Sequence, residues 1–173
     1  MSPSQPAPAP DAAGVADAAD VAELERALTR IAYLLTRARR NDLITATAGV
    51  PLDRAAVVVL LQLAETGAMR PGELAARLEV EAPHITRQVQ RLARAGYAER
   101  AGDPADRRAQ LIRLTPAGRA AARRLRQAGR QGMQAALAHW PSADLHQLTT
   151  LFHRMVDDFL AYAADHEHGQ PTG

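Results

Sequence analysis

The segment from Arg70 to Arg119 limits the possible folds more than any other part of the chain. Leu74 and Leu78 fit one face of a short helix, and Val80 follows as the buried apolar residue of a tight turn. A second helix is expected to begin at Glu81 to Pro83, because proline costs no backbone hydrogen bond in a first turn and glutamate favours the positive end of a helix. The segment therefore predicts two short helices joined by a tight turn.

The second of these helices has one apolar face. Ile85, Val89 and Leu92 repeat at intervals of four and three residues, so they are expected to point inward together. Arginine, glutamine, histidine and threonine fill the outward positions, and such side chains can pair with base edges in the DNA major groove. An ordinary solvated helix rich in arginine would have the same composition. The candidate DNA-binding residues of this helix are Pro83, His84, Thr86, Arg87, Gln88, Gln90 and Arg91.

A short hairpin is expected directly after this helix. Residues 97–100 and 111–115 have the composition of paired strands, and turn residues lie between them. Arginine on a thin projection can enter a minor groove. The loop of this hairpin carries Arg107 and Arg108. Asp103 or Asp106 could instead pair with these two arginines and stiffen the loop. The order of elements is that of a winged helix-turn-helix, which makes the fold class mainly α with a small β-wing. The candidate DNA-binding residues of the wing are Asp106, Arg107 and Arg108.

Four motifs of this segment are Ile85-Thr86-Arg87, Gly96-Tyr97, the D-x-x-D-x-R pattern of Asp103, Asp106 and Arg108, and Leu114-Thr115 with Gly118. Together they resemble the motifs of the MarR (multiple antibiotic resistance regulator) family of bacterial transcription factors. The resemblance implies that Arg108 enters a groove and that Asp106 orients it. In this family the second helix is the recognition helix, which enters the major groove. The chain departs from the family pattern at the start of this helix, where the family often has small hydroxyl residues and residues 81–84 here are Glu-Ala-Pro-His.

Helices are expected on both sides of this segment. From Asp20, leucine and isoleucine recur at helical spacing in one long helix that runs towards Thr47. A second helix begins near Asp53, whose carboxylate can cap it, and its continuous apolar block predicts burial on nearly all sides. After the wing, Thr115 is expected to cap a long helix, and Ser142 can cap a final one.

The first and last helices each carry an apolar stripe that no further segment of the chain is available to cover. Pairing with a second copy would bury both stripes, and the family resemblance implies dimerisation through the terminal helices. A two-fold dimer would hold two recognition helices about 34–36 Å apart, which is one turn of DNA. We therefore expect a homodimer that binds double-stranded DNA at a near-palindromic site.

The length of 173 residues suits one domain with a substantial core. We expect this domain to contain a DNA-binding part between two sets of dimerisation helices. The expected boundaries are a disordered Pro/Ala-rich tail at 1–19, a single domain at 20–165 with the winged helix-turn-helix at 52–118 and dimerisation helices at 20–48 and 116–165, and a flexible tail at 166–173.

Positive charge is concentrated in one part of the chain. Residues 70–130 hold 14 arginines against 6 acidic residues, a local balance of +8, whereas the rest of the chain has a balance of −6. This distribution directs the positive field to the segment that would face DNA. The chain has no cysteine, which excludes disulfides and thiol redox switches. No apolar run approaches the ~20 residues of a membrane span, and no secretory signal is evident, so we expect a cytoplasmic protein without a membrane partner.

Three histidines recur every seven residues, at His139, His146 and His153. On one helix such neighbours stand about 10.5 Å apart, which is too far for them to share an ion within one chain. A zinc site between two chains could use them, or they could simply flank a dimer interface. The spacing is therefore compatible with a metal site between chains and with a purely structural role.

No arrangement for catalysis is evident, because the chain lacks a Gly-rich phosphate loop and a nucleophile motif. We expect no enzymatic activity and no required cofactor. The expected function is a homodimeric, sequence-specific transcriptional regulator, usually a repressor in this family, whose DNA affinity a small-molecule effector could change. The alternatives are a zinc-responsive regulator of the same fold and a winged-helix protein-interaction module that does not bind DNA. In this family a ligand crevice lies between the dimerisation helices and the DNA-binding part. The resemblance therefore implies that Tyr33, Arg37, Val57 and Leu61 line such a crevice.

Overall fold

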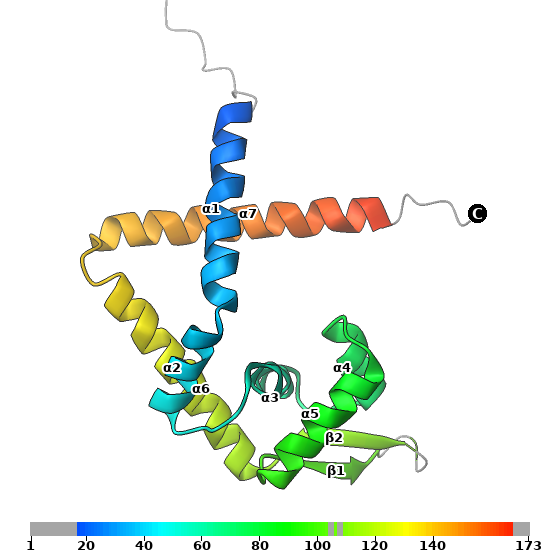
Figure 1. Ribbon diagram of the computed structural model, residues 1–173. Coiled ribbons are helices and arrows are strands. Elements are labelled where there is room, and N and C mark those ends of the chain that lie inside the picture. The colour runs from blue at the N-terminus through cyan, green and yellow to red at the C-terminus, as the bar shows by residue number, and fades with distance from the viewer. Residues whose placement is uncertain (1–16, 104–105, 107–108, 168–173) are drawn as a thin grey trace, which may run out of the picture. The chain divides into compact units, whose positions relative to one another are not determined.

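The computed structural model describes residues 17–103, 106 and 109–167, and it is mainly helical with a small two-stranded sheet (Figure 1). This confirms the expected fold class. The chain divides into two compact units, Met1–Ala128 and Gly129–Gly173. The elements are α1 (Ala18–Thr36), α2 (Ala38–Ala48), α3 (Arg54–Thr66), α4 (Pro71–Arg77), α5 (Ala82–Arg94), β1 (Ala98–Gly102), β2 (Gln110–Leu114), α6 (Pro116–Ala136) and α7 (Ser142–Glu167).

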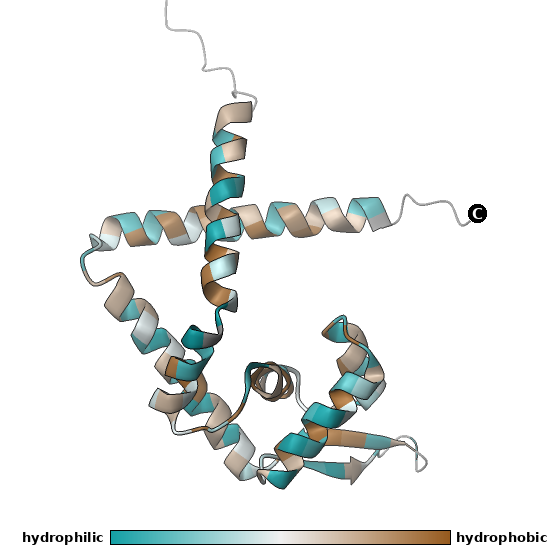
Figure 2. Ribbon diagram, in the orientation of Figure 1, coloured by the Kyte–Doolittle hydropathy of each residue, from teal (hydrophilic) through white to brown (hydrophobic). Residues whose placement is uncertain are grey.

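Helix α3 supplies the centre of the core of the first unit. Its cap is the expected one, because the Asp53 Oδ1 atom accepts a hydrogen bond from the Ala56 amide at 2.9 Å. Leu60 is fully buried, and α3 packs against both α5 and β2. Figure 2 shows hydrophobic residues along most of α3. The expected burial on nearly all sides has one exception, since Val58 is 41% exposed.

Helices α4 and α5 form the predicted pair joined by a tight turn. Leu74 of α4 is fully buried. Glu79 adopts the left-handed conformation with φ of 52°, and the Val80 amide then donates to the carbonyl of Ala75 at 3.0 Å. The prediction that Val80 is buried in the turn is wrong, because its side chain is 38% exposed. The turn is closed by backbone hydrogen bonds, and Val80 lies at the rim of an apolar cavity instead.

The predicted hairpin forms with slightly shifted ends. Strands β1 and β2 are antiparallel, with Ala98 opposite Leu114 and Gly102 opposite Gln110. Tyr97 lies outside β1, because its amide closes the end of α5 by donating to the Leu92 carbonyl at 2.8 Å. Met69 adds a bridge to Ile112 that sequence periodicity did not predict.

The expected single helix from residue 20 towards residue 47 is wrong. The structure has two helices there, and Arg37 between them is extended, with φ of −62° and ψ of 130°. Arg54 Nη1 donates to the Thr36 carbonyl at 2.7 Å, so the last residue of α1 has a hydrogen-bond partner outside the helix. Helix α1 begins at Ala18, two residues earlier than expected, because the side chain of Asp17 caps it.

Helix α7 is the main element of the second unit. Within the described residues of α7 the side chains are exposed, apart from a half-buried Met155. Hydrophobic positions recur along α7 between hydrophilic ones (Figure 2). No helix in the described part of the chain is long and apolar enough to cross a membrane. Ser142, expected as the cap, is the first residue of the helix.

The start of α6 is fixed against the exit of α5. Thr115 Oγ1 accepts the Gly118 amide at 3.0 Å, which is the expected cap, and donates to the Gly96 carbonyl at 2.6 Å. The Thr115 amide donates to the Tyr97 carbonyl at 3.1 Å. Gly118 is buried directly against the Tyr97 backbone, and a Cβ atom there would overlap the Tyr97 carbonyl oxygen. The connection therefore depends on a residue without a side chain.

Replacing Gly118 with alanine is expected to destabilise the protein by about 1–3 kcal/mol or more, because the backbone of Tyr97 must move to admit the methyl group. Gly132→Ala in the same helix is the matched control. A Cβ there meets nothing within 4 Å, and alanine should stabilise the helix by up to about 1 kcal/mol. Urea unfolding of both variants measures the difference. Equal stability of the two variants would contradict this account of the joint.

Candidate nucleic-acid interface

Helix α5 presents two different faces. Its inward residues Ile85, Val89 and Leu92 are at most 3% exposed, which confirms the predicted apolar face. Arg87 and Gln90 lie on the exposed side. Because the buried face is packed against α3 and α4, the direction of the exposed face is determined by the core.

Most of the candidate residues on α5 line one polar cavity of about 450 Å³. Pro83 is exposed in the first turn of α5. Thr86 is exposed too, but its hydroxyl donates to the Ala82 carbonyl at 3.1 Å within the helix. The structure thus brings together five of the seven candidates and adds two residues. The lining residues are Asp53, His84, Arg87, Gln88, Gln90, Arg91 and Arg94.

Asp53 is the acidic member of this cavity. Its Oδ1 atom caps α3, and its Oδ2 atom forms an ion pair with Nη1 of Arg91. Both side chains remain about half exposed. The sequence indicated the capping role of Asp53 but not the ion pair. Asp53 precedes and caps α3, whereas Arg91 lies on α5, so no local periodicity relates them.

Gln88 contributes a polar atom that is not paired. Its Oε1 atom is buried and has no hydrogen-bond partner among the described residues. A buried acceptor without a donor costs about 1–3 kcal/mol. A ligand that supplied a donor at this position would therefore gain from the contact.

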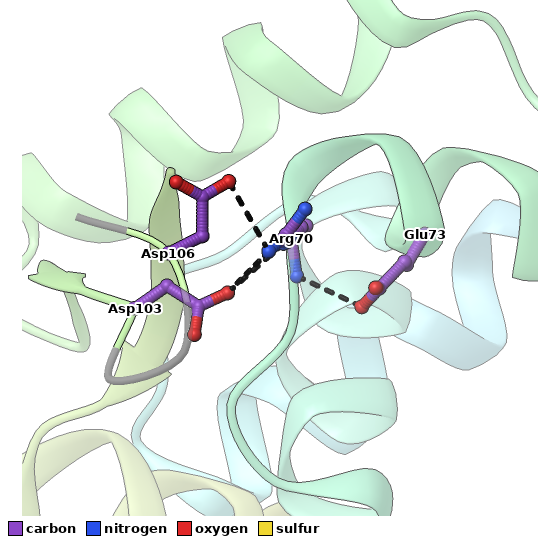
Figure 3. Close-up of polar contacts among 4 residues, drawn as sticks. All are labelled: Arg70, Glu73, Asp103 and Asp106. Carbon is purple, nitrogen blue, oxygen red and sulfur yellow. Dashed lines mark hydrogen bonds and ion pairs between the residues drawn. The ribbon is translucent and has the colours of Figure 1, made fainter. Parts of the chain in front are cut away.

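The base of the wing is attached to the start of α4 by ion pairs (Figure 3). Arg70 Nη2 lies 2.7 Å from Asp103 Oδ2 and 3.6 Å from Asp106 Oδ2. The Arg70 amide also donates to Glu73 Oε2 at 3.1 Å. The hydrogen bond and charge of Asp103 raise the pKa of the Arg70 guanidinium above its ordinary value, so Arg70 remains a cation. Sequence analysis identified both aspartates but missed Arg70.

The two wing arginines, Arg107 and Arg108, lie outside the described residues. Orientation of Arg108 by Asp106 therefore stays a prediction. The described part of the wing shows how its base is held. The Asp103 amide donates to the Ala109 carbonyl at 3.1 Å, and the Ala109 amide donates to the Asp106 carbonyl at 2.9 Å. These bonds close the hairpin across the segment that carries the arginines.

The four candidate ligand-lining residues form two separate groups. The Arg37 guanidinium lies 4.7 Å from the centre of the Tyr33 ring, and its Nη2 atom donates to the Tyr33 hydroxyl at 3.2 Å. Val57 is buried in the core, and Leu61 is half-buried against it. A different, largely apolar cavity of about 320 Å³ lies between α3 and the start of α5, lined by Arg54, Ala55, Val58, Val59, Leu78, Val80, His84 and Ile85.

The three regularly spaced histidines lie in the second unit. His139 is in the connection after α6, and His146 and His153 are exposed on α7. Among the residues that the structure describes, no three His, Asp or Glu side chains are grouped in a way that could hold a metal ion.

Comparisons with known proteins agree with this architecture. A model of the MarR family matches residues 52–109. The chain is 40% identical over 80 residues to an uncharacterised HTH-type transcriptional regulator of Mycobacterium bovis. That match covers 44% of this chain and 56% of the relative, so the chain spans about half the length of the curated relatives it matches.

Solved structures extend the likeness over most of the chain. A MarR family protein from Bacillus stearothermophilus has a TM-score of 0.74 at 22% identity, covering 84% of this chain and 99% of that one. A probable transcriptional regulator from Pseudomonas aeruginosa is 31% identical, with a TM-score of 0.53, covering 72% of this chain and 96% of that one. With the family model matching the helix-turn-helix and the start of the wing, these findings show that the chain belongs to the MarR family.

Proposed function

We propose that this protein is a homodimeric, sequence-specific DNA-binding transcriptional regulator that acts as a repressor. The observation that carries the proposal is the cavity on α5, where arginine, glutamine and histidine side chains gather opposite a fully packed face. The naming of the mycobacterial relative as an HTH-type transcriptional regulator supports the same function.

The chemistry of the α5 face suits the edges of base pairs. The guanidinium groups of Arg87 and Arg91 can donate two hydrogen bonds to guanine O6 and N7, and the amide of Gln90 can pair with adenine. The surrounding excess of arginine in residues 70–130 favours approach to phosphates. Arg107 and Arg108 are proposed to contact the adjacent minor groove.

Exposed apolar side chains support dimerisation. Soluble monomers rarely expose large contiguous apolar patches, yet both α1 and α7 expose many large hydrophobic residues. A second copy of the chain is the proposed partner, and two copies would place two α5 helices on a near-palindromic site. The exposed residues of α7 are Leu145, Leu148, Leu151, Phe152, Val156, Phe159, Leu160 and Tyr162.

Regulation by a small molecule is a further part of the proposal. A ligand that binds one arrangement of the two copies more tightly than the other would change the distance between the α5 helices. It can shift this balance only by its difference in affinity for the two arrangements. DNA is then released because the two helices no longer match successive major grooves.

Arg87→Ala is expected to weaken operator binding by about 1–3 kcal/mol, roughly 5- to 150-fold, if the guanidinium makes a bidentate contact with guanine. Fluorescence anisotropy with an operator selected from genomic fragments measures the change. Arg39→Ala, which removes an exposed arginine of α2, is the control and should leave the affinity within about twofold. An Arg87→Ala variant that binds as tightly as the parent would argue against this contact.

Phe152→Glu is expected to convert the dimer to a monomer, because a buried unpaired charge at an apolar interface is costly. Sedimentation velocity at micromolar concentrations reports the change. Thr150→Glu places the same charge on an exposed residue of the opposite side of α7 and should leave the dimer intact. A parent protein that sediments as a monomer would refute the proposed assembly.

Asp103→Ala is expected to weaken binding to all operators by a similar factor, because it loosens the wing without altering base contacts. It is also expected to cost about 1–3 kcal/mol of stability, because the Asp103 side chain is only 11% exposed and accepts two hydrogen bonds from the Arg70 guanidinium, so binding is measured well below the unfolding temperature. Glu99→Ala breaks a different ion pair of the hairpin, with Arg113, and serves as control. Unchanged DNA affinity in Asp103→Ala would show that the Arg70 contacts do not position the wing.

A further inference from the structure

Asp53 supplies the one carboxylate among the residues that line the cavity on α5, and three arginines supply its positive charge. An acidic group at a surface that binds phosphates and guanine acceptors is unfavourable by charge alone. Asp53 nevertheless has two defined contacts there, with the Ala56 amide at 2.9 Å and with the guanidinium of Arg91. This combination requires an explanation beyond helix capping, because capping uses only one of the two oxygens.

The two contacts connect the recognition helix to the central helix of the core. Asp53 Oδ1 is held by the first turn of α3, so Oδ2 has a fixed position relative to the core. The Arg91 side chain is about half exposed and would otherwise sample many rotamers. The ion pair selects among these rotamers before any DNA arrives. A side chain held in advance loses less conformational entropy on binding.

The pair also has a definite hydrogen-bonding pattern. A G·C base pair offers two acceptors on guanine, O6 and N7, and one donor on cytosine, N4, in the major groove. The guanidinium of Arg91 has five N–H donors in a planar fork, so donors remain after one contacts Asp53. The guanidinium held by Asp53 can therefore still offer two donors to the O6 and N7 atoms of one guanine.

We propose that Asp53, from outside the recognition helix, is a positioning residue that holds Arg91 and thereby makes the Asp53–Arg91 pair specific for one G·C base pair of the operator. This inference rests on the proposed DNA-binding function. A carboxylate that only repelled DNA would lower affinity for every sequence equally. A positioning carboxylate instead increases the difference between the correct base pair and its replacements.

Asp53→Asn separates these two effects. Asparagine caps a helix as well as aspartate does, so α3 keeps its cap while the charge that holds Arg91 is removed. Asp53→Ser, which also retains a capping oxygen, is the second variant in case the amide alters the cavity. Asp42→Asn neutralises an exposed aspartate of α2 and is the matched control. Thermal unfolding of each full-length variant verifies that the fold is retained.

The measurement is the ratio of affinities for the operator and for operators with single base-pair replacements, obtained by fluorescence anisotropy at fixed salt. Arg91→Ala first identifies the base pair that Arg91 contacts. Replacing that pair lowers the affinity of the parent protein but leaves the affinity of Arg91→Ala unchanged. At that pair the parent protein and Asp42→Asn should discriminate by roughly tenfold or more. Asp53→Asn and Asp53→Ser should discriminate by less than about threefold. Asp53→Asn combined with Arg91→Ala should lose no more discrimination than Arg91→Ala alone.

Two results would overturn the inference. One is an Asp53→Asn protein that binds all sequences more tightly while its discrimination stays that of the parent, which would leave Asp53 only a repulsive group. The other is unchanged affinity and unchanged discrimination in both Asp53 variants. A parent protein that binds no duplex selectively would overturn the proposed function together with the inference, and this outcome is distinct from the first two.

Discussion

The packing of α5 against α3 is the constraint on which the rest of the structure depends. Ile85 and Leu92 are completely buried, and they meet a helix whose own residues Val59 and Leu60 are buried as well. Rotation of α5 about its axis would expose these side chains, at a cost of about 1.5–3 kcal/mol for each. The arginine-bearing face is therefore held outward by the core. Local contacts then refine that face, since Asp53 pairs with Arg91.

Much of the fold could be predicted because its signals are local. The interval of Ile85 and Val89, the cap at Asp53 and the cap at Thr115 all depend on residues within a few positions of one another. Two of the features that were missed or wrong depend on distant residues. Arg54 donates a hydrogen bond to the Thr36 carbonyl at the point where the expected single helix is interrupted. Arg70 forms an ion pair with Asp103, which is 33 positions away in the sequence.

The candidate site follows the same division. Periodicity predicted which residues of α5 point outward, because a helix has a fixed repeat. It could not predict that Asp53 joins them, since this contact arises only when α3 and α5 pack together. Nor could it predict that Thr86 directs its hydroxyl to the carbonyl of Ala82. The base of the wing is similar, because the motif identified Asp103 and Asp106 but gave no indication of Arg70.

The central claim is that the exposed face of α5 reads DNA sequence in the major groove. Titration of the full-length protein with duplex DNA at several salt concentrations tests it most directly, with a selected near-palindromic site and a scrambled duplex of the same composition. The account predicts that log affinity falls linearly with log salt for both duplexes, and that the selected site binds at least about a thousandfold more tightly at physiological salt. Equal affinity for the two duplexes, or no binding at low salt, would contradict it.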